Sequence, residues 1–194
     1  MLRYIFLHSF SKGYLMGTAQ KPSDVKLFIA FLYNENAPLD LVAEKLDLLY
    51  GKRLYSLGPL PFSWTEYYSG EMGQSLQKVY FSYEKSIDRS DLPAIKNYTN
   101  SIEELTADHN GNRTVNIDPG YVSRDKVVLA TTKDFYHRLY IADGIFAEVT
   151  LHYRKGSFRY FSWTYPDFRN PATLQFLERI RAPLVKEIRT GEKL

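Results

Sequence analysis

The sequence predicts an α+β protein in which a ferredoxin-like split βαβ core is extended by an antiparallel meander and a C-terminal helix. Strand and helix patterns over residues 25–118 follow the order β-α-β-β-α-β, which is the basis for the core. Residues 126–161 contain only short strand patterns separated by turns. The chain then ends with one amphipathic helical pattern, so the predicted class combines both element types in separate regions.

The length of the chain, 194 residues, fits one domain with a sizeable core. No composition break separates its halves, so we expect a single domain over residues 21–194. Residues 1–20 lack clear periodicity and are expected to form a poorly structured extension, within which Met16 is an alternative start of translation.

Composition excludes several classes of protein. The chain has no cysteine, which excludes disulfides, thiol nucleophiles and thiolate metal sites and suits the cytoplasm. No apolar run approaches the roughly 18 to 20 residues that span a bilayer, so we expect a soluble protein with no membrane association. The net charge of +3 neither indicates nor excludes a nucleic-acid partner.

The split core begins with its two clearest elements. Residues Val25–Tyr33 are apolar apart from Lys26, which is typical of a central strand buried on both faces. Apolar residues then recur at three- and four-residue spacing over Leu39–Tyr50, which predicts an amphipathic helix that ends at Gly51.

The remaining core elements are a hairpin, a second helix and a last strand. Strand patterns at residues 63–69 and 76–84 flank the turn at residues 70–73. The second helix starts at Ser90 or Asp91 and is expected to stop at Asn110-Gly111. A strand at residues 113–118 follows, and Pro119-Gly120 suits a type II turn.

The meander and the final helix complete the chain. Meander strands are expected at residues 126–132, 134–141, 145–154 and 157–161. The helix begins at Asn170-Pro171 and turns Leu174, Leu177, Ile180 and Leu184 inward. Pro183 should kink or divide it.

The turn at residues 142–144 sets the register of the meander. A two-residue loop would place Leu139 opposite Glu148 and mix apolar with charged side chains. A three-residue loop with Gly144 in a left-handed bulge position places Arg138 opposite Glu148 and separates the two kinds. Because a one-residue slip exchanges the faces of all side chains, the burial pattern favours the second register.

That register predicts a polar face and an apolar face. The polar face is expected to carry Asp134, Arg138, Glu148, His152 and Arg159, with Tyr136, Tyr140, Phe146 and Phe161 between them. It is either a solvated surface with cross-strand ion pairs, each contributing roughly 0.2 to 1 kcal/mol, or a pocket covered by a helix or a ligand. On the other face, with Phe135, Leu139 and Ile141, His137 is best interpreted as a core histidine with one hydrogen bond.

A second group of polar residues lies near the ends of the two strands predicted at residues 113–118 and 126–132. Asn116 and Asp118 alternate with apolar residues, and Asp118 either caps the Pro119-Gly120 turn or helps to bind a phosphate or a hard cation. Thr132 and Lys133 would then supply a hydroxyl group and a positive charge to the anion.

Known catalytic signatures are absent from the sequence. Before Gly51-Lys52, Leu46 stands where a P-loop has glycine, and Arg53 stands where it has serine or threonine. No dinucleotide-binding glycine pattern, no paired helical histidines and no nucleophile elbow is found. No cofactor and no metal site can therefore be assigned, and whether the protein is an enzyme stays open.

Several segments are similar to a known family. They are residues 21–33, Asn-Ile-Asp-Pro-Gly-Tyr at 116–121, Leu-Ala-Thr-Thr-Lys-Asp at 129–134, His-Arg at 137–138, Ala-Glu-Val-Thr-Leu at 147–151 and Trp-Thr-Tyr-Pro-Asp at 163–167. With them the chain, from Met16 onward, resembles the prokaryotic domain-of-unknown-function family 4416. The resemblance implies no activity beyond a GTP-binding label, and this chain has Phe135 where a guanine-specifying aspartate would follow Thr132-Lys133-Asp134.

The leading hypothesis is a domain that binds a small molecule or a nucleotide-like phosphate ester through the polar sheet face. Its candidate residues are Asp118, Lys133, Arg138 and Glu148, followed by Asn116, Asp134, His137 and His152. In this view, alanine replacement of Arg138 and Glu148 removes binding and spares the fold. The alternative is a non-catalytic nucleic-acid or protein-binding module that uses an aromatic-rich sheet face.

Overall fold

The computed structural model describes residues 18–190, so most of the extension expected at residues 1–20 lies outside the described residues. The strands are β1 (Val25–Tyr33), β2 (Arg53–Pro61), β3 (Gln77–Ile87), β4 (Val115–Val122), β5 (Lys126–Thr131), β6 (Arg138–Ala142), β7 (Ile145–Arg154) and β8 (Ser157–Tyr160). The helices are α1 (Leu39–Tyr50), α2 (Ser69–Met72), α3 (Leu92–Leu105), α4 (Pro166–Arg169) and α5 (Pro171–Thr190), with a 3₁₀ turn at Arg89–Asp91. In this part of the chain no helix is long and apolar enough to cross a membrane.

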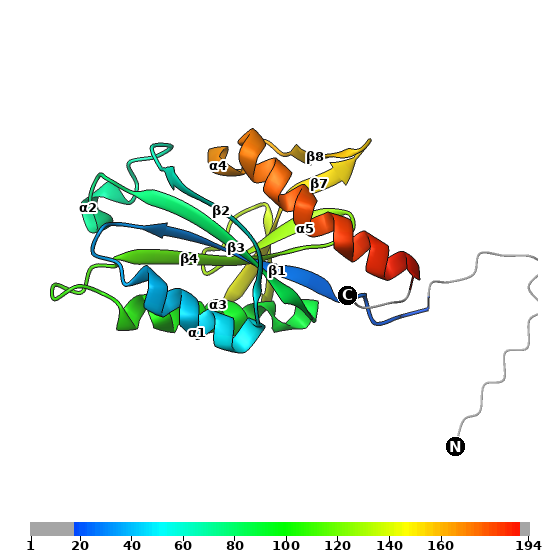
Figure 1. The fold of residues 1–194 in the computed structure, drawn as a ribbon, viewed down its shortest axis with the longest axis horizontal. Helices are drawn as coiled ribbons and strands as arrows, with labels where there is room; N and C mark the ends of the chain where they lie inside the picture. Colours follow the sequence, from blue (N-terminus) through cyan, green and yellow to red (C-terminus); the bar gives the residue numbers. More distant parts are fainter. Residues whose placement is uncertain (1–17, 191–194) are drawn as a thin grey trace, which may run out of the picture.

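The strands form one antiparallel sheet in the order β2-β3-β1-β4-β5-β7-β6. The four strands β2, β3, β1 and β4 are labelled in Figure 1. These first four strands have the order of a ferredoxin-like core, and the meander extends the sheet beyond β4. Strands β6 and β8 share one edge of β7, where β6 pairs with residues 145–148 and β8 with residues 151–154. The structure thus confirms the predicted α+β class, the extension of the core and the C-terminal helix.

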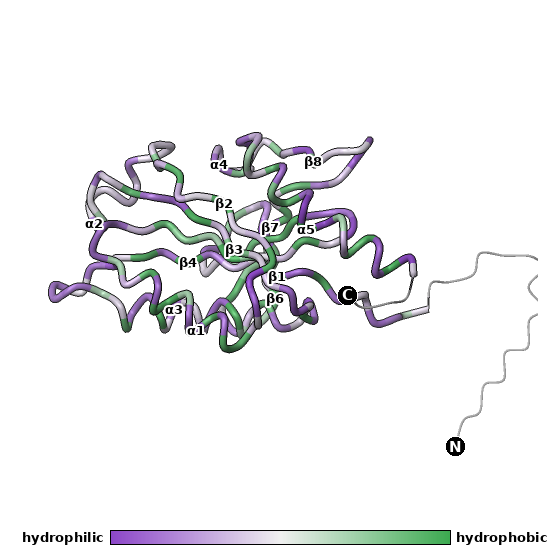
Figure 2. The backbone as a smooth tube through the Cα atoms, in the orientation of Figure 1, coloured by the Kyte–Doolittle hydropathy of each residue, from purple (hydrophilic) through white to green (hydrophobic). Residues whose placement is uncertain are grey.

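Helices cover both faces of the first strands. Helices α1 and α3 lie on one face and α5 lies on the other (Figure 1). Between the layers are two apolar cores, one of which contains Leu27, Ile29 and Phe31 and the other Phe28 and Ala30, all from β1. Apolar segments accordingly run through the middle of the molecule (Figure 2). The prediction that this strand is central and buried on both faces is confirmed.

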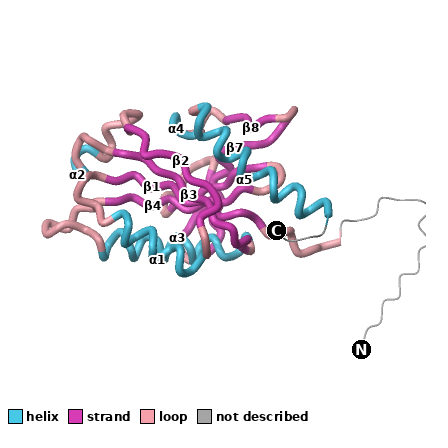
Figure 3. The backbone as a smooth tube through the Cα atoms, in the orientation of Figure 1, coloured by secondary structure: helices cyan, strands magenta, loops and turns pink. Residues whose placement is uncertain are grey.

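The predicted hairpin had the wrong first strand. The strand that precedes β3 in the chain and pairs with it is β2, whereas residues 63–69 form a loop that leads into the short helix α2 (Figure 3). Pro59 and Pro61 make β2 resemble a loop in sequence. They are tolerated because β2 is the edge strand of the sheet, where a missing N–H group need not break a ladder.

Four prolines and glycines that were expected to end or interrupt elements behave differently in the structure. Pro119 and Gly120 form no turn and lie inside β4, which continues to Val122. Helix α3 ends at Leu105, before the expected stop at Asn110-Gly111. Pro183 lies within α5, which continues through it as one helix.

The predicted register of the meander is confirmed, because Arg138 pairs with Glu148. The turn differs from the three-residue loop expected. Asp143 and Gly144 form a two-residue turn with φ values of 51° and 77°, as in type I′ hairpins, and an irregularity between Tyr140 and Ala142 restores the register.

Pairing in this hairpin stops at Arg138, so the strand is shorter than the one expected at residues 134–141, and Asp134 and Tyr136 do not pair with β7. The reason is that β8 occupies the edge of β7 from Leu151 onward. The apolar face expected around Leu139 is also wrong. Phe135, Leu139 and Ile141 are exposed, because β6 is the outermost strand.

Candidate functional site

The site lies where two neighbouring strands separate. Strands β4 and β5 pair only over Gly120–Val122, opposite residues 127–129, so among residues 18–190 the first half of β4 has no strand neighbour on this side. A cavity of about 760 Å³ occupies this region. Its walls come from β4, β5, α3, the loop before α2 and the segment around α4, including Asn116, Asp118, Leu129, Thr131 and Phe168.

Helix α3 supplies the hydrogen bonds that β5 does not make. The Ile117 N–H donates to Glu103 Oε1 at 2.7 Å, and Lys96 Nζ donates to the Ile117 carbonyl oxygen at 2.7 Å. In an antiparallel strand, alternate residues face the same neighbour, so Pro119, which has no N–H, faces the same gap. Burial raises the pKa of Glu103, although Lys96 acts against this effect.

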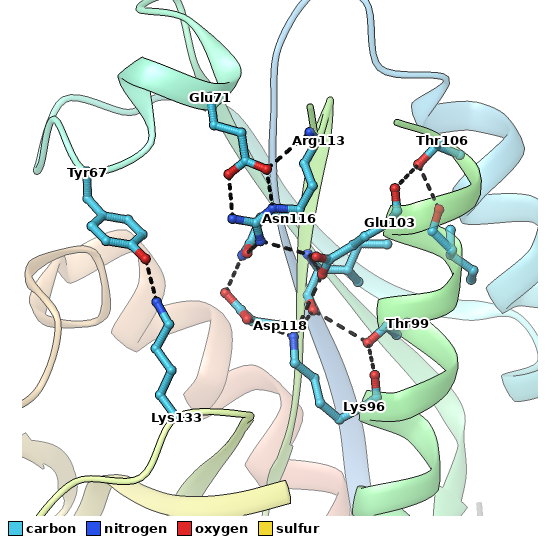
Figure 4. Close-up of polar contacts among 12 residues, drawn as sticks. Tyr67, Glu71, Lys96, Thr99, Glu103, Thr106, Arg113, Asn116, Asp118 and Lys133 are labelled. Carbon is cyan, nitrogen blue, oxygen red and sulfur yellow. Dashed lines mark hydrogen bonds and ion pairs between the residues drawn. The ribbon is translucent and has the colours of Figure 1, made fainter. Parts of the chain in front are cut away.

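A chain of charged contacts continues from these residues toward α2 (Figure 4). Lys96 Nζ lies 3.2 Å from Asp118 Oδ1, and Asn116 donates to Asp118 Oδ2 at 2.7 Å. Arg113 donates to Asn116 at 2.8 Å and to Glu103 at 3.2 Å, and it binds Glu71 at 2.7 Å. Burial alone would raise the pKa of Asp118, but Lys96 and then Lys78 outweigh it, and its pKa is lowered.

This lowered pKa predicts a component of acid sensitivity. Stability that comes from a carboxylate with a depressed pKa is present above the pKa of the unfolded chain, about 3.9 for Asp, and is lost as pH falls through the folded value. We therefore expect the variant Asp118→Asn to have a smaller slope of unfolding free energy against pH below about 4. Urea titrations over this range measure the slope, and Asp134→Asn, at an exposed position outside the cavity, is the control. Equal slopes in the wild-type protein and Asp118→Asn would contradict the assignment.

Lys78 brings a further buried cation to the cavity. Its ammonium lies 3.1 Å from Asp167 Oδ2, which also accepts a hydrogen bond from the Tyr80 hydroxyl group at 3.0 Å. Within residues 18–190 this is the only ion pair of Lys78, whose ammonium also lies 5.5 Å from the centre of the Phe62 ring and 5.7 Å from the centre of the Tyr80 ring. An ammonium group has three N–H donors, so Lys78 has donors available on the cavity side.

Glu148 binds the side chains of Arg138 and His137 on the side of the cavity next to β6. Its Oε2 atom accepts from Arg138 Nε at 3.1 Å and lies 3.0 Å from His137 Nε2. Arg138 also donates to the Lys133 carbonyl oxygen at 3.1 Å and to the Tyr165 hydroxyl group at 3.0 Å. Since Glu148 is only 2% exposed, the interpretation of this pair as a solvated surface ion pair is wrong. The position predicted for His137, on the opposite face, is also wrong, because the residue precedes β6 and strand alternation does not apply to it.

Lys133 and three exposed aromatic side chains border the cavity. Lys133 Nζ donates to the Tyr67 hydroxyl oxygen at 2.6 Å and lies 4.5 Å from the centre of the Tyr67 ring (Figure 4). This hydrogen bond lowers the pKa of Tyr67. Trp64 and Tyr165, like Tyr67, are exposed and line the cavity. Flat apolar surface is therefore available beside a charged group.

The cavity brings together most of the predicted candidates. Those that line it are Asn116, Asp118, Lys133, Arg138 and Glu148. His137 does not line the cavity, but it contacts Glu148, which does. Asp134 is exposed and lies outside the cavity. His152 also lies outside, against Phe161, whose ring stacks on Trp163. Because Pro119-Gly120 is not a turn, Asp118 is not a turn cap.

Sequence reasoning missed several residues of the site, namely Tyr67, Lys78, Lys96, Glu103, Arg113 and Asp167. One signal was present in the helix. Lys96, Thr99 and Glu103 follow Leu92 at spacings of four, seven and eleven residues, which puts all four on one helical face. Polar residues on the face of an apolar residue indicate a polar contact inside the protein. No comparable signal marks Lys78 or Asp167.

In the described part of the chain, no group of three or more histidine, aspartate or glutamate side chains is placed to hold a metal ion.

Comparison with known proteins agrees with the resemblance noted in the sequence. No curated protein and no solved structure matches the chain. One family model, the domain of unknown function DUF4416, matches residues 23–183, which is most of its length. The chain therefore belongs to the DUF4416 family.

Proposed function

We propose that the cavity between β4 and β5 binds a small organic molecule that carries an anionic group such as a phosphate ester. The observation that carries the proposal is that the Lys133 ammonium group has no carboxylate partner within residues 18–190. This ammonium faces the cavity, and its one hydrogen bond within residues 18–190 is to the Tyr67 hydroxyl group, with no ion pair to a carboxylate. Two N–H donors of this ammonium are therefore available to an anion.

The other charges of the cavity support the same location for the anion. The lining contains five cationic side chains, Lys78, Lys96, Arg113, Lys133 and Arg138, and five acidic ones, Glu103, Glu104, Asp118, Glu148 and Asp167. Lys96, Arg113 and Arg138 are each engaged by two or more partners, which leaves Lys133 and Lys78 with free donors. Thr131 and Thr132, which also line the cavity, place hydroxyl groups next to Lys133 in the chain.

The size and the border of the cavity support a ligand with a flat ring. A volume of about 760 Å³ lies within the range of roughly 300 to 1,000 Å³ common for small-molecule sites. Trp64, Tyr67 and Tyr165 offer exposed ring surface at its border. Rings of this kind stack on planar groups, and each base-aromatic contact contributes about 1 to 3 kcal/mol in proteins that bind nucleotides. A nucleotide-like ester combines both features.

A thermal-shift screen of nucleotides, phosphorylated metabolites and inorganic phosphate tests the proposal. A ligand present at about 100 times its Kd should stabilise the protein by about 2.7 kcal/mol. Lys133→Met should weaken binding about 10- to 100-fold, because a hydrogen bond to a charged group contributes roughly 1.5 to 3 kcal/mol. The measurement is the ligand concentration that gives half of the maximal shift.

The matched control for this screen is Lys85→Met, which removes the same charge from an exposed position on β3 that does not line the cavity. It should bind like the wild-type protein. The proposal fails if no phosphate-bearing compound raises the unfolding temperature. It also fails if both lysine variants lose affinity equally, since the effect would then come from overall charge.

A further inference from the structure

The two edges of the sheet differ in how they are protected against pairing. The edge strand β2 contains Pro59 and Pro61 and has two irregularities in its pairing with β3. Prolines and irregular pairing are the usual means by which edge strands avoid adding further strands. Strand β6, at the other edge, has no proline and a single irregularity, next to its turn, and within residues 18–190 no strand pairs with its outer side.

Strand β6 also exposes a continuous apolar surface. Leu139 is 72% exposed and Tyr140 is 64% exposed, and Ile141 is exposed beside them. Phe135 and Tyr136, just before the strand, extend this surface. Its one charged residue, Arg138, is turned toward Glu148 inside the protein. A bare, uncharged edge with large apolar side chains is the condition under which strands associate.

We infer that β6 is an interaction surface for a second copy of this chain, joined by antiparallel pairing of the two β6 strands about a twofold axis. Such an interface uses the same patch on both copies, so the strand must be complementary to itself. Pairing centred on Tyr140 meets this requirement. It sets Leu139 opposite Ile141 of the other copy, and the two Tyr140 residues opposite each other, so apolar groups meet apolar groups.

Charge favours the antiparallel arrangement of two copies. The exposed Asp143 lies at the turn after β6, whereas the charge of Arg138, at the other end of the strand, is turned inward and paired with Glu148. Antiparallel pairing places the Asp143 carboxylates of the two copies at opposite ends of the interface, whereas parallel pairing would bring them together. Like charges on facing strands oppose pairing. Arg138 also lines the cavity, so the interface would adjoin the candidate site without being part of it.

Sedimentation of the full chain from micromolar to sub-millimolar concentration tests this inference. We expect the wild-type protein to reach twice the mass of the chain and to dissociate on dilution. Leu139→Lys places a charge on the edge and should remain a monomer. Leu105→Lys, which changes a residue 79% exposed on α3, should sediment like the wild-type protein. A wild-type monomer at all concentrations, or a Leu139→Lys dimer as stable as the wild-type dimer, would overturn the inference.

A cysteine cross-link tests the position of the interface independently. The chain has no cysteine, so Tyr140→Cys introduces a single thiol next to the proposed axis. Directly opposite residues of antiparallel strands have Cβ atoms about 4.5 to 5.5 Å apart, close to disulfide geometry. Mild oxidation should produce a linked dimer from Tyr140→Cys and not from Tyr160→Cys, whose position on β8 is also exposed. Equal cross-linking in both variants, or none in Tyr140→Cys, counts against the proposed pairing.

Discussion

Replacement of Glu148 by alanine should lower the free energy of unfolding by about 3 to 5 kcal/mol, the usual loss when one partner of a buried ion pair is removed. The Glu148 carboxylate is 2% exposed and is shared by Arg138 and His137. Without it, the Arg138 guanidinium keeps within residues 18–190 only two neutral acceptors, the Lys133 carbonyl oxygen and the Tyr165 hydroxyl group. Urea unfolding followed by circular dichroism measures the loss.

The control for this variant is Glu84→Ala, because Glu84 is an exposed glutamate on a strand of the same sheet. Its replacement should change stability by no more than about 0.5 kcal/mol. A loss below about 1 kcal/mol in Glu148→Ala would mean that Arg138 and His137 do not depend on Glu148. The expectation from sequence that alanine at Arg138 and Glu148 spares the fold is therefore revised, and ligand binding is better tested at the exposed Lys133.

Local patterns were sufficient to predict elements that are regular and buried. The bounds of β1, α1 and β7 follow from unbroken apolar runs, helical spacing and alternation within a few residues. The register of Arg138 with Glu148 was predictable because one slip would have exchanged the faces of the side chains. Strand β2 was missed because its prolines are acceptable only at an edge, and the position of a strand in the sheet is not a local property.

The candidate site was predicted in part because half of it depends on distant contacts. Asn116, Asp118 and Glu148 lie at strand positions that sequence alternation can assign, and Lys133 comes two residues after the end of β5. Lys78 and Asp167 meet across 89 residues of chain, and Lys96 and Glu103 matter only because β4 and β5 separate at Ile117. No short-range sequence pattern predicts that β4 and β5 separate at this point.

The alternative function, a nucleic-acid or protein-binding module with an open aromatic sheet face, depends on which parts of the sheet stay uncovered. Helices α1, α3 and α5 cover the faces around β1, so exposed rings remain mainly near β6 and around the cavity. Around the cavity they border the site proposed for a small ligand. At β6 they form an edge better suited to strand pairing than to base stacking.

The second large effect is expected at Gly120, the first residue of β4 that pairs with β5. A Cβ atom at this position would lie 2.6 Å from the Val128 carbonyl oxygen, 2.7 Å from the Phe28 ring and 2.9 Å from the Leu129 side chain. The Val128 oxygen belongs to the backbone of β5 and cannot move without moving that strand. Gly120→Ala should therefore cost about 3 kcal/mol, at the upper end of the usual effect of overpacking.

Gly70→Ala is the matched control, since nothing lies within 4 Å of a Cβ atom at Gly70 and the residue is in helix α2. It should leave the unfolding midpoint in urea unchanged or raise it slightly, because alanine favours helix more than glycine does. Equal midpoints for both variants would show that β5 can shift away from β4 without cost. Strands β4 and β5 could then separate beyond Gly120, and the position at which the cavity between them ends would not be fixed by this contact. A midpoint lowered only in Gly120→Ala instead means that close contact at Gly120 fixes where the sheet opens, and with it the position of Asp118 and Lys133 across the cavity.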